Sequence, residues 1–98
     1  MTLSTNSTPV DLVDNINVVL LRLPPAVSLD DRIITAIKMC ILEGVDTTSH
    51  IIGVLKRLGF DNRKVAAVLV GNTGTLPASH HWRVDSSSRY HLLEMPVG

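Results

Sequence analysis

The first quarter of the chain carries an apolar residue at every third or fourth position. These residues are Leu12, Ile16, Val19, Leu20 and Leu23. This spacing places them on one face of a helix. Thr8 followed by Pro9 is a typical helix start, because proline suits the first helical position, and Pro24-Pro25 ends the run. The pattern predicts a helix over residues 9–22.

A second helical stripe follows and is strongly apolar. Its members are Ile33, Ile34, Ile37, Cys40 and Ile41. Ser28, with Asp31 three residues later, resembles a capping box with the shorter acid in place of glutamate. Gly44 is a suitable residue just past a helix end. The pattern predicts a helix that begins after Ser28 and ends at Gly44.

Two shorter stripes follow, joined by a tight turn at Gly59-Phe60. The first stripe contains Ile51, Ile52, Leu55 and Leu58, and the second contains Val65, Val68 and Leu69. Either Thr47 or Thr48 caps the first helix, and either Asp61 or Asn62 caps the second. The breaker cluster at residues 71–74 marks a turn or loop after the second helix.

The last quarter changes from helical to alternating periodicity. Residues 81–84 and 89–93 form two short runs that can alternate inward and outward as strands. The polar segment 85–88 between them has the composition of a hairpin loop. Trp82 and Val84 share one face of their strand. The element order predicts an α+β fold that is mainly α, with four helices followed by a hairpin.

Length and composition favour one small intracellular domain. The chain has 98 residues, 45% of them hydrophobic, with no net charge, which excludes disorder throughout. We expect one domain over residues 9–94, a flexible tail over 1–8 and a short tail over 95–98. No apolar run is long enough to span a membrane, and no secretory signal pattern is present. We therefore expect a soluble cytoplasmic protein, with no membrane partner.

Charge is distributed unevenly along the chain. Residues 1–31 contain four aspartates and one arginine, a net charge of −3. Residues 47–93 contain six lysines or arginines and two aspartates, a net charge of +4. Such polarity suggests a charged partner for the second half of the chain, although chance unevenness also produces it.

The helix pair around Gly59 has the sequence form of a helix-turn-helix. In that unit the start of the second helix enters the major groove, and here it carries Asn62, Arg63 and Lys64. The positions expected at base edges are Asn62, Arg63 and Ala67. Arginine can pair bidentately with guanine, and asparagine with adenine. The alternative is a solvated helix start. Cations there oppose the helix dipole, however, and an anion would relieve that conflict.

The run TTSHIIGVLKRLGFDNRKVAAVL, followed by HWRVDSSSRYHLL, resembles the winged helix-turn-helix family over about residues 28–94. The resemblance implies a three-helix core, a two-stranded wing at about residues 81–93 and an additional N-terminal helix. It also implies a recognition helix at about residues 61–70. The implied function is sequence-specific binding of double-stranded DNA, as a nucleoid-associated transcriptional regulator.

The same resemblance assigns phosphate contacts. The wing would provide Arg83, Ser87 and Arg89. The start of the helix before the recognition helix would provide Thr48 and Ser49. The competing hypothesis is a winged-helix module that binds another protein and no DNA. A DNA-binding chain should show its cations on one continuous face, without Asp30, Asp31 or Glu43 among them. Those cations are Arg63, Lys64, Arg83 and Arg89.

Two further hypotheses concern the aromatic residues and the first helix. A single-strand binder would require Trp82 and Tyr90 to be exposed together, whereas such a pair is more often a core anchor.

The helix over residues 9–22 is apolar on more than one face, which predicts a homodimer. Its expected contacts are Val13, Ile16, Leu20 and Leu23. Alternatively, this helix covers the helix that follows Ser28 and the helix that follows Gly59-Phe60 in its own subunit.

Catalysis and metal binding have little support in the sequence. The serine triplet at 86–88 lacks the glycine elbow of a nucleophile, and no paired acids mark a cleft. The four histidines and Cys40 match no common zinc spacing. We therefore expect no enzyme activity and no cofactor, and the sequence identifies no small-molecule effector.

Overall fold

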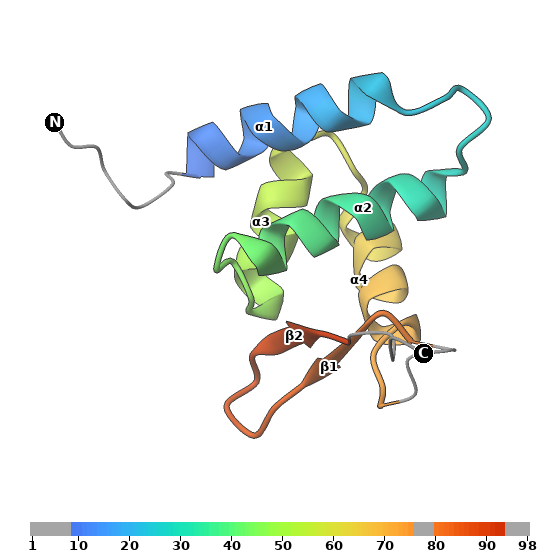
Figure 1. Cartoon of the computed structure of the whole chain (residues 1–98). Helices are drawn as coiled ribbons and strands as arrows, with labels where there is room; N and C mark the ends of the chain where they lie inside the picture. The colour runs from blue at the N-terminus through green and yellow to red at the C-terminus, as the bar shows by residue number, and fades with distance from the viewer. Residues whose placement is uncertain (1–8, 76–79, 94–98) are drawn as a thin grey trace, which may run out of the picture.

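The structure is a computed structural model that describes residues 9–75 and 80–93 of the chain. Four helices precede a two-stranded hairpin (Figure 1). The elements are α1 (Pro9–Arg22), α2 (Leu29–Leu42), α3 (Thr48–Arg57), α4 (Asn62–Gly71), β1 (Trp82–Val84) and β2 (Tyr90–Leu92). This confirms the predicted α+β, mainly α class. The expected tails, 1–8 and 95–98, lie outside the described residues.

The helix ends follow from local chemistry. The Ser28 side chain accepts a hydrogen bond from the Asp31 amide at 3.1 Å, and Asp61 accepts one from the Lys64 amide at 3.0 Å. These are the caps predicted for α2 and α4, and each satisfies an amide that has no partner inside the helix. After α2 and α3 the backbone enters the positive-φ region at Gly44 and Gly59, where glycine adds no strain.

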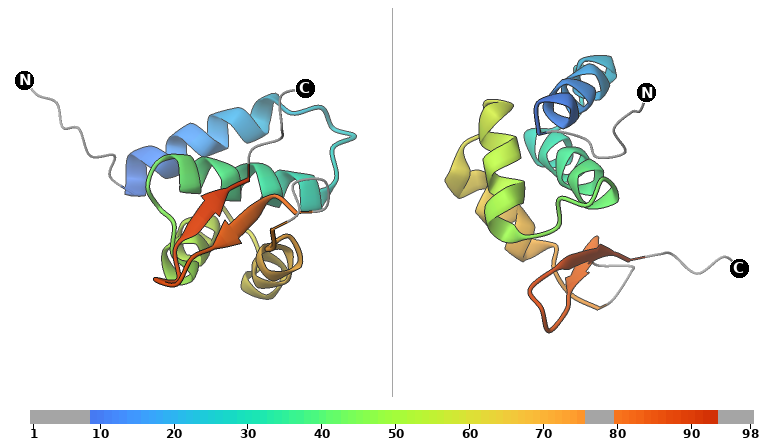
Figure 2. Two further views of the ribbon diagram at one scale, coloured as in Figure 1. Left: turned by 60° about the horizontal axis from the view of Figure 1, so that its bottom comes forward. Right: turned by 90° about the vertical axis from the view of Figure 1, so that its left-hand side faces the viewer.

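The four helices enclose one apolar core. In two views α1 and α2 lie side by side, α3 and α4 cross beneath them, and the hairpin closes the opposite end (Figures 1 and 2). The fully buried side chains include Ile33, Ile37, Ile51, Leu55, Val65, Leu69 and Trp82. Burial of each large side chain stabilises the fold by about 1.5–3 kcal/mol relative to exposure.

Trp82 anchors the hairpin to this core. Its indole Nε1 donates to the Leu69 carbonyl at 2.9 Å and approaches the Thr73 hydroxyl at 3.0 Å. The buried ring therefore leaves no unsatisfied polar atom, as a core tryptophan requires. This arrangement fixes β1 against the end of α4.

The hairpin is also tied to the residues that precede α3. Within the hairpin, Trp82 pairs with Leu92, and Val84 pairs with Tyr90, in an antiparallel register. An isolated bridge joins Thr47 to Arg89, and the Tyr90 amide donates to the Asp46 carbonyl at 2.7 Å. The segment before α3 thus pairs with β2 and its preceding residue, which fixes the hairpin relative to the first turn of α3.

Helix α1 packs within its own chain. Ile16 is fully buried and Leu20 is 8% exposed, both in the core shared with the other helices. Val13 and Leu23 are partly buried against the same core. Helices α2 and α3 cover the face of α1 that carries Ile16 and Leu20, and the homodimer stays a prediction. The observed packing agrees with the alternative in which the first helix covers α2, but its second neighbour is α3 and not the expected α4.

Two groups on Arg32 hold the connection between α1 and α2. Its Nη1 donates to the Leu20 carbonyl at 3.2 Å, and its Nη2 donates to the Pro24 carbonyl at 3.3 Å. Both carbonyls also accept a backbone amide, from Leu23 and Val27 respectively, so the guanidinium adds a second donor to each and ties α2 to the connection. Within the described ranges, no helix has both the length and the hydropathy to cross a membrane.

Candidate nucleic-acid interface

The exposed face of α4 begins with the residues predicted to read DNA. Asn62 and Arg63 are exposed in its first turn, with Val65 and Leu69 buried on the opposite side. Further along the exposed face lie Ala67 and Val70, the latter 71% exposed. Helix α4 therefore presents a polar start followed by small apolar side chains.

Lys64 is neutralised by an acid from α2. Its Nζ lies 2.8 Å from Oδ1 of Asp30, and both side chains are partly exposed. Asp61 lies at the N-cap of the same helix. Two acids thus balance the two cations, Arg63 and Lys64, at the start of α4. By the criterion set from the sequence, the presence of Asp30 in this cluster argues against a strongly cationic DNA surface.

The hairpin loop is organised around Asp85. His91 Nε2 lies 2.7 Å from Oδ2 of this carboxylate, and Oδ1 accepts from the amides of Arg89 at 3.1 Å and Ser87 at 2.8 Å. These bonds, the one to His91 foremost, lower the pKa of Asp85 from 3.8 to about 2. Ser88 adopts a φ of 64° within the turn. The loop is therefore held by one ionised acceptor.

The predicted wing residues have different environments. Arg83 is exposed on β1, opposite His91 in the register, and Ser87 is exposed in the loop. Arg89 Nη1 instead lies 2.9 Å from Oδ1 of Asp46. Arg89 therefore anchors the hairpin to the segment before α3 and is only partly available to a phosphate.

The structure brings Thr48 and the hairpin together. The Thr48 hydroxyl lies 3.1 Å from the Tyr90 hydroxyl, and Thr48 and Ser49 are both exposed at the start of α3. Trp82 is fully buried and Tyr90 is 8% exposed, so the hypothesis of a stacking platform for single strands is wrong. Both rings anchor the hairpin, because the inward face of a short hairpin must pack on the core.

The predicted DNA contacts form two groups. Helix α4 begins beside α2 and ends beside the hairpin (Figures 1 and 2), so its first turn and the wing lie at opposite ends of the helix. Arg63 and Arg83, one in each group, form no ion pair within the described ranges. Lys64 and Arg89, again one in each group, are paired with acids. The four cations therefore lie in two separate groups. In each group one cation is paired with an acid, and the other has no ion pair within the described ranges.

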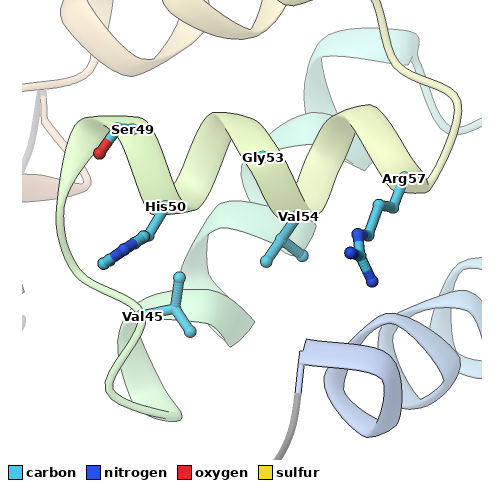
Figure 3. Close-up of a pocket in the computed structure, with 6 residues that line it drawn as sticks. All are labelled: Val45, Ser49, His50, Gly53, Val54 and Arg57. Carbon is cyan, nitrogen blue, oxygen red and sulfur yellow. The ribbon is translucent and has the colours of Figure 1, made fainter.

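Sequence reasoning missed a cavity beside α3. Its volume is about 330 Å³, and it is lined by Val45, Ser49, His50, Gly53, Val54 and Arg57 (Figure 3). Four of these residues stand at positions i, i+3, i+4 and i+7 of α3 and therefore share one helix face: His50, Gly53, Val54 and Arg57. That spacing was the available signal. It was missed because the apolar stripe on the opposite face of α3 dominates the pattern.

The remaining reactive groups do not form a site. Burial raises the pKa of the Cys40 thiol to about 12, which keeps the side chain protonated as a small core residue. Burial, and then Lys38, lower the pKa of His81, which reduces its ability to become cationic near the hairpin. Among the described residues, no three histidines, cysteines or acids gather closely enough to hold a metal ion.

No family model, curated protein or solved structure matches the chain. The resemblance to the winged helix-turn-helix family therefore stays a prediction.

Proposed function

We propose that the chain binds double-stranded DNA in the manner of a winged helix-turn-helix protein and acts as a sequence-specific transcriptional regulator. One observation carries the proposal: the Thr47–Arg89 bridge and the Tyr90–Asp46 hydrogen bond hold the hairpin at the start of α3. This leaves the outer face of α4 and the hairpin loop open on the surface. In a winged helix-turn-helix protein the second helix would enter the major groove, and the wing would contact the flanking backbone.

Each end of the proposed interface has suitable chemistry. In the first turn of α4, the exposed side chains of Asn62 and Arg63 offer donors for adenine and guanine edges. In the hairpin, Arg83 and Ser87 are exposed and suited to phosphate oxygens. These contacts divide between base recognition and positioning on the backbone.

The ion pairs predict modest DNA affinity. An exposed pair such as Lys64–Asp30 is worth at most about 1 kcal/mol, so a DNA phosphate can displace Asp30. The acid nevertheless remains near the DNA and opposes binding. With no net charge on the whole chain, non-specific affinity will be weak and strongly dependent on salt.

The experiment is fluorescence anisotropy with a random duplex at low and moderate salt, on the full chain. We compare Arg63→Gln with Lys56→Gln, which removes the same charge from an exposed position of α3 outside the proposed interface. Arg63→Gln should weaken binding roughly tenfold, with little change for Lys56→Gln. Selection from a randomised duplex pool then tests sequence specificity.

A second candidate, a module that binds another protein and no DNA, has its own supporting observation. The middle of the exposed α4 face is apolar, with Ala67 and Val70, and Lys64 beside it is neutralised. Protein interfaces favour apolar centres depleted of charge. Absence of DNA binding at low salt by a folded sample would favour this candidate.

A further inference from the structure

The cavity beside α3 has apolar walls. It lies between α3 and the loop that joins α2 to α3 (Figure 3). Val54 enters it from the helix, and Val45 faces it from the loop. A volume of about 330 Å³ is within the range of small-molecule sites, which are concave and mostly apolar. The cavity is separate from the outer face of α4.

Two basic side chains lie at the edges of the cavity. His50 and Arg57 come from the same helix, seven residues apart, and lie on either side of Val54 in Figure 3. Neither forms a hydrogen bond or ion pair within the described part of the chain. The six lining residues include no aspartate or glutamate. Within the described part of the chain, the cavity therefore combines an apolar interior with a basic edge.

Gly53 keeps this space open. It lies inside α3, where glycine lowers helix stability relative to alanine. A Cβ placed on Gly53 would meet no other atom within 4 Å, so close packing does not require glycine there. Its backbone φ is not in the left-handed region either. Gly53 therefore lines the cavity with backbone alone.

We propose that this cavity binds a small carboxylate with an apolar tail. The Arg57 guanidinium pairs with the carboxylate through charge-assisted hydrogen bonds. The tail lies against Val45 and Val54. A neutral apolar molecule would leave Arg57 unpaired, and a purely polar anion would leave the walls in contact with water. This inference does not depend on DNA binding.

The test is a titration of the ¹⁵N-labelled full chain, followed by amide chemical shifts. Three probes separate the contributions: octanoate has charge and tail, octanamide has the tail alone, and acetate has the charge alone. Octanoate should bind saturably, with the largest shifts between Val45 and Arg57. Octanamide and acetate should each bind at least roughly tenfold more weakly, as expected for loss of a charge-assisted bond or of the apolar contact.

Three variants locate the binding. Arg57→Gln should abolish the advantage of octanoate over octanamide, whereas its neighbour Lys56→Gln, an exposed cation outside the cavity, should retain it. Gly53→Leu should block octanoate, because its side chain extends into open space, and the added helix propensity keeps the chain folded.

Three results would overturn the proposal. One is equal affinity for octanoate and octanamide. Another is an unchanged octanoate affinity in a folded Gly53→Leu chain. The third is a set of shifts centred away from Val45 and Arg57.

Discussion

Helices α3 and α4 bury similar apolar faces in the core, but their exposed faces differ. Both have ten residues and bury three apolar side chains: Ile51, Val54 and Leu55 in α3, and Val65, Val68 and Leu69 in α4. Outside the core, α3 exposes His50 and Arg57 around a glycine, whereas α4 exposes Arg63 followed by small apolar residues. The comparison separates what builds the helix pair from what the pair offers to partners.

The two helices also differ in how their charges are balanced. Lys64 of α4 is paired with Asp30, and Asp61 lies beside it at the N-cap. Arg57 of α3 has no ion pair within the described residues. A helix that resembles a recognition helix in sequence thus has less free charge than its neighbour. Counts of charge along the sequence did not reveal this, because they omit partners from distant elements.

The largest expected effect comes from truncating a buried core side chain in either helix. Leu55→Ala in α3 and Leu69→Ala in α4 should each lower the free energy of unfolding by about 2–5 kcal/mol, since both side chains are buried. Urea denaturation measures the change. Val70→Ala is the matched control, because Val70 is exposed, and should stay within about 0.5 kcal/mol. A loss below about 1 kcal/mol in either helix would contradict its place in the core.

The next effect concerns the stability change when glycine and alanine are interchanged at exposed positions of the two helices. Gly53→Ala should raise the free energy of unfolding by about 0.5–1 kcal/mol, because alanine favours the helix and has room. Ala67→Gly, at an exposed position of α4, should lower it by a similar amount. Thermal and urea unfolding of both variants test this. A destabilised Gly53→Ala chain would show that α3 needs glycine for packing.

A smaller effect concerns the charge on α4. Asp30→Asn frees Lys64 and removes an acid from the proposed interface, so DNA affinity should rise roughly two- to fivefold. Asp14→Asn on α1 removes the same charge from an exposed position away from α4 and serves as the control. Fluorescence anisotropy at low salt measures both. Equal affinities for the two variants would separate Asp30 from the DNA surface.

The most local effect is a pH dependence of the hairpin loop. Because folding lowers the pKa of Asp85 from 3.8 to about 2, its contribution to stability is present above pH 3.8 and disappears as the pH falls through about 2. The amide shifts of Ser87 and Arg89, which donate to this carboxylate, should follow that titration. Asp85→Asn should remove the step. Amide shifts that titrate near pH 4 would indicate an unperturbed carboxylate.

The sequence by itself determined the helices and the hairpin. Ser28 and Asp61 cap the helices as predicted, and the change of period near residue 81 marks the strands. These features are readable because capping bonds span three residues and helical hydrogen bonds span four. Alternation likewise marks strand faces without knowledge of the rest of the fold.

The tertiary structure alone decided which surfaces remain available. It buried Ile16 of α1 in its own chain, where the sequence suggested a dimer contact. It joined Lys64 to Asp30, 34 positions earlier, and brought Val45 of the loop and Arg57 of α3 to the wall of one cavity. Such contacts depend on how helices cross and on where loops return, and neither is encoded within a window of a few residues. The chemistry of this surface is therefore set by long-range packing, because packing decides which charges meet and which apolar faces are covered.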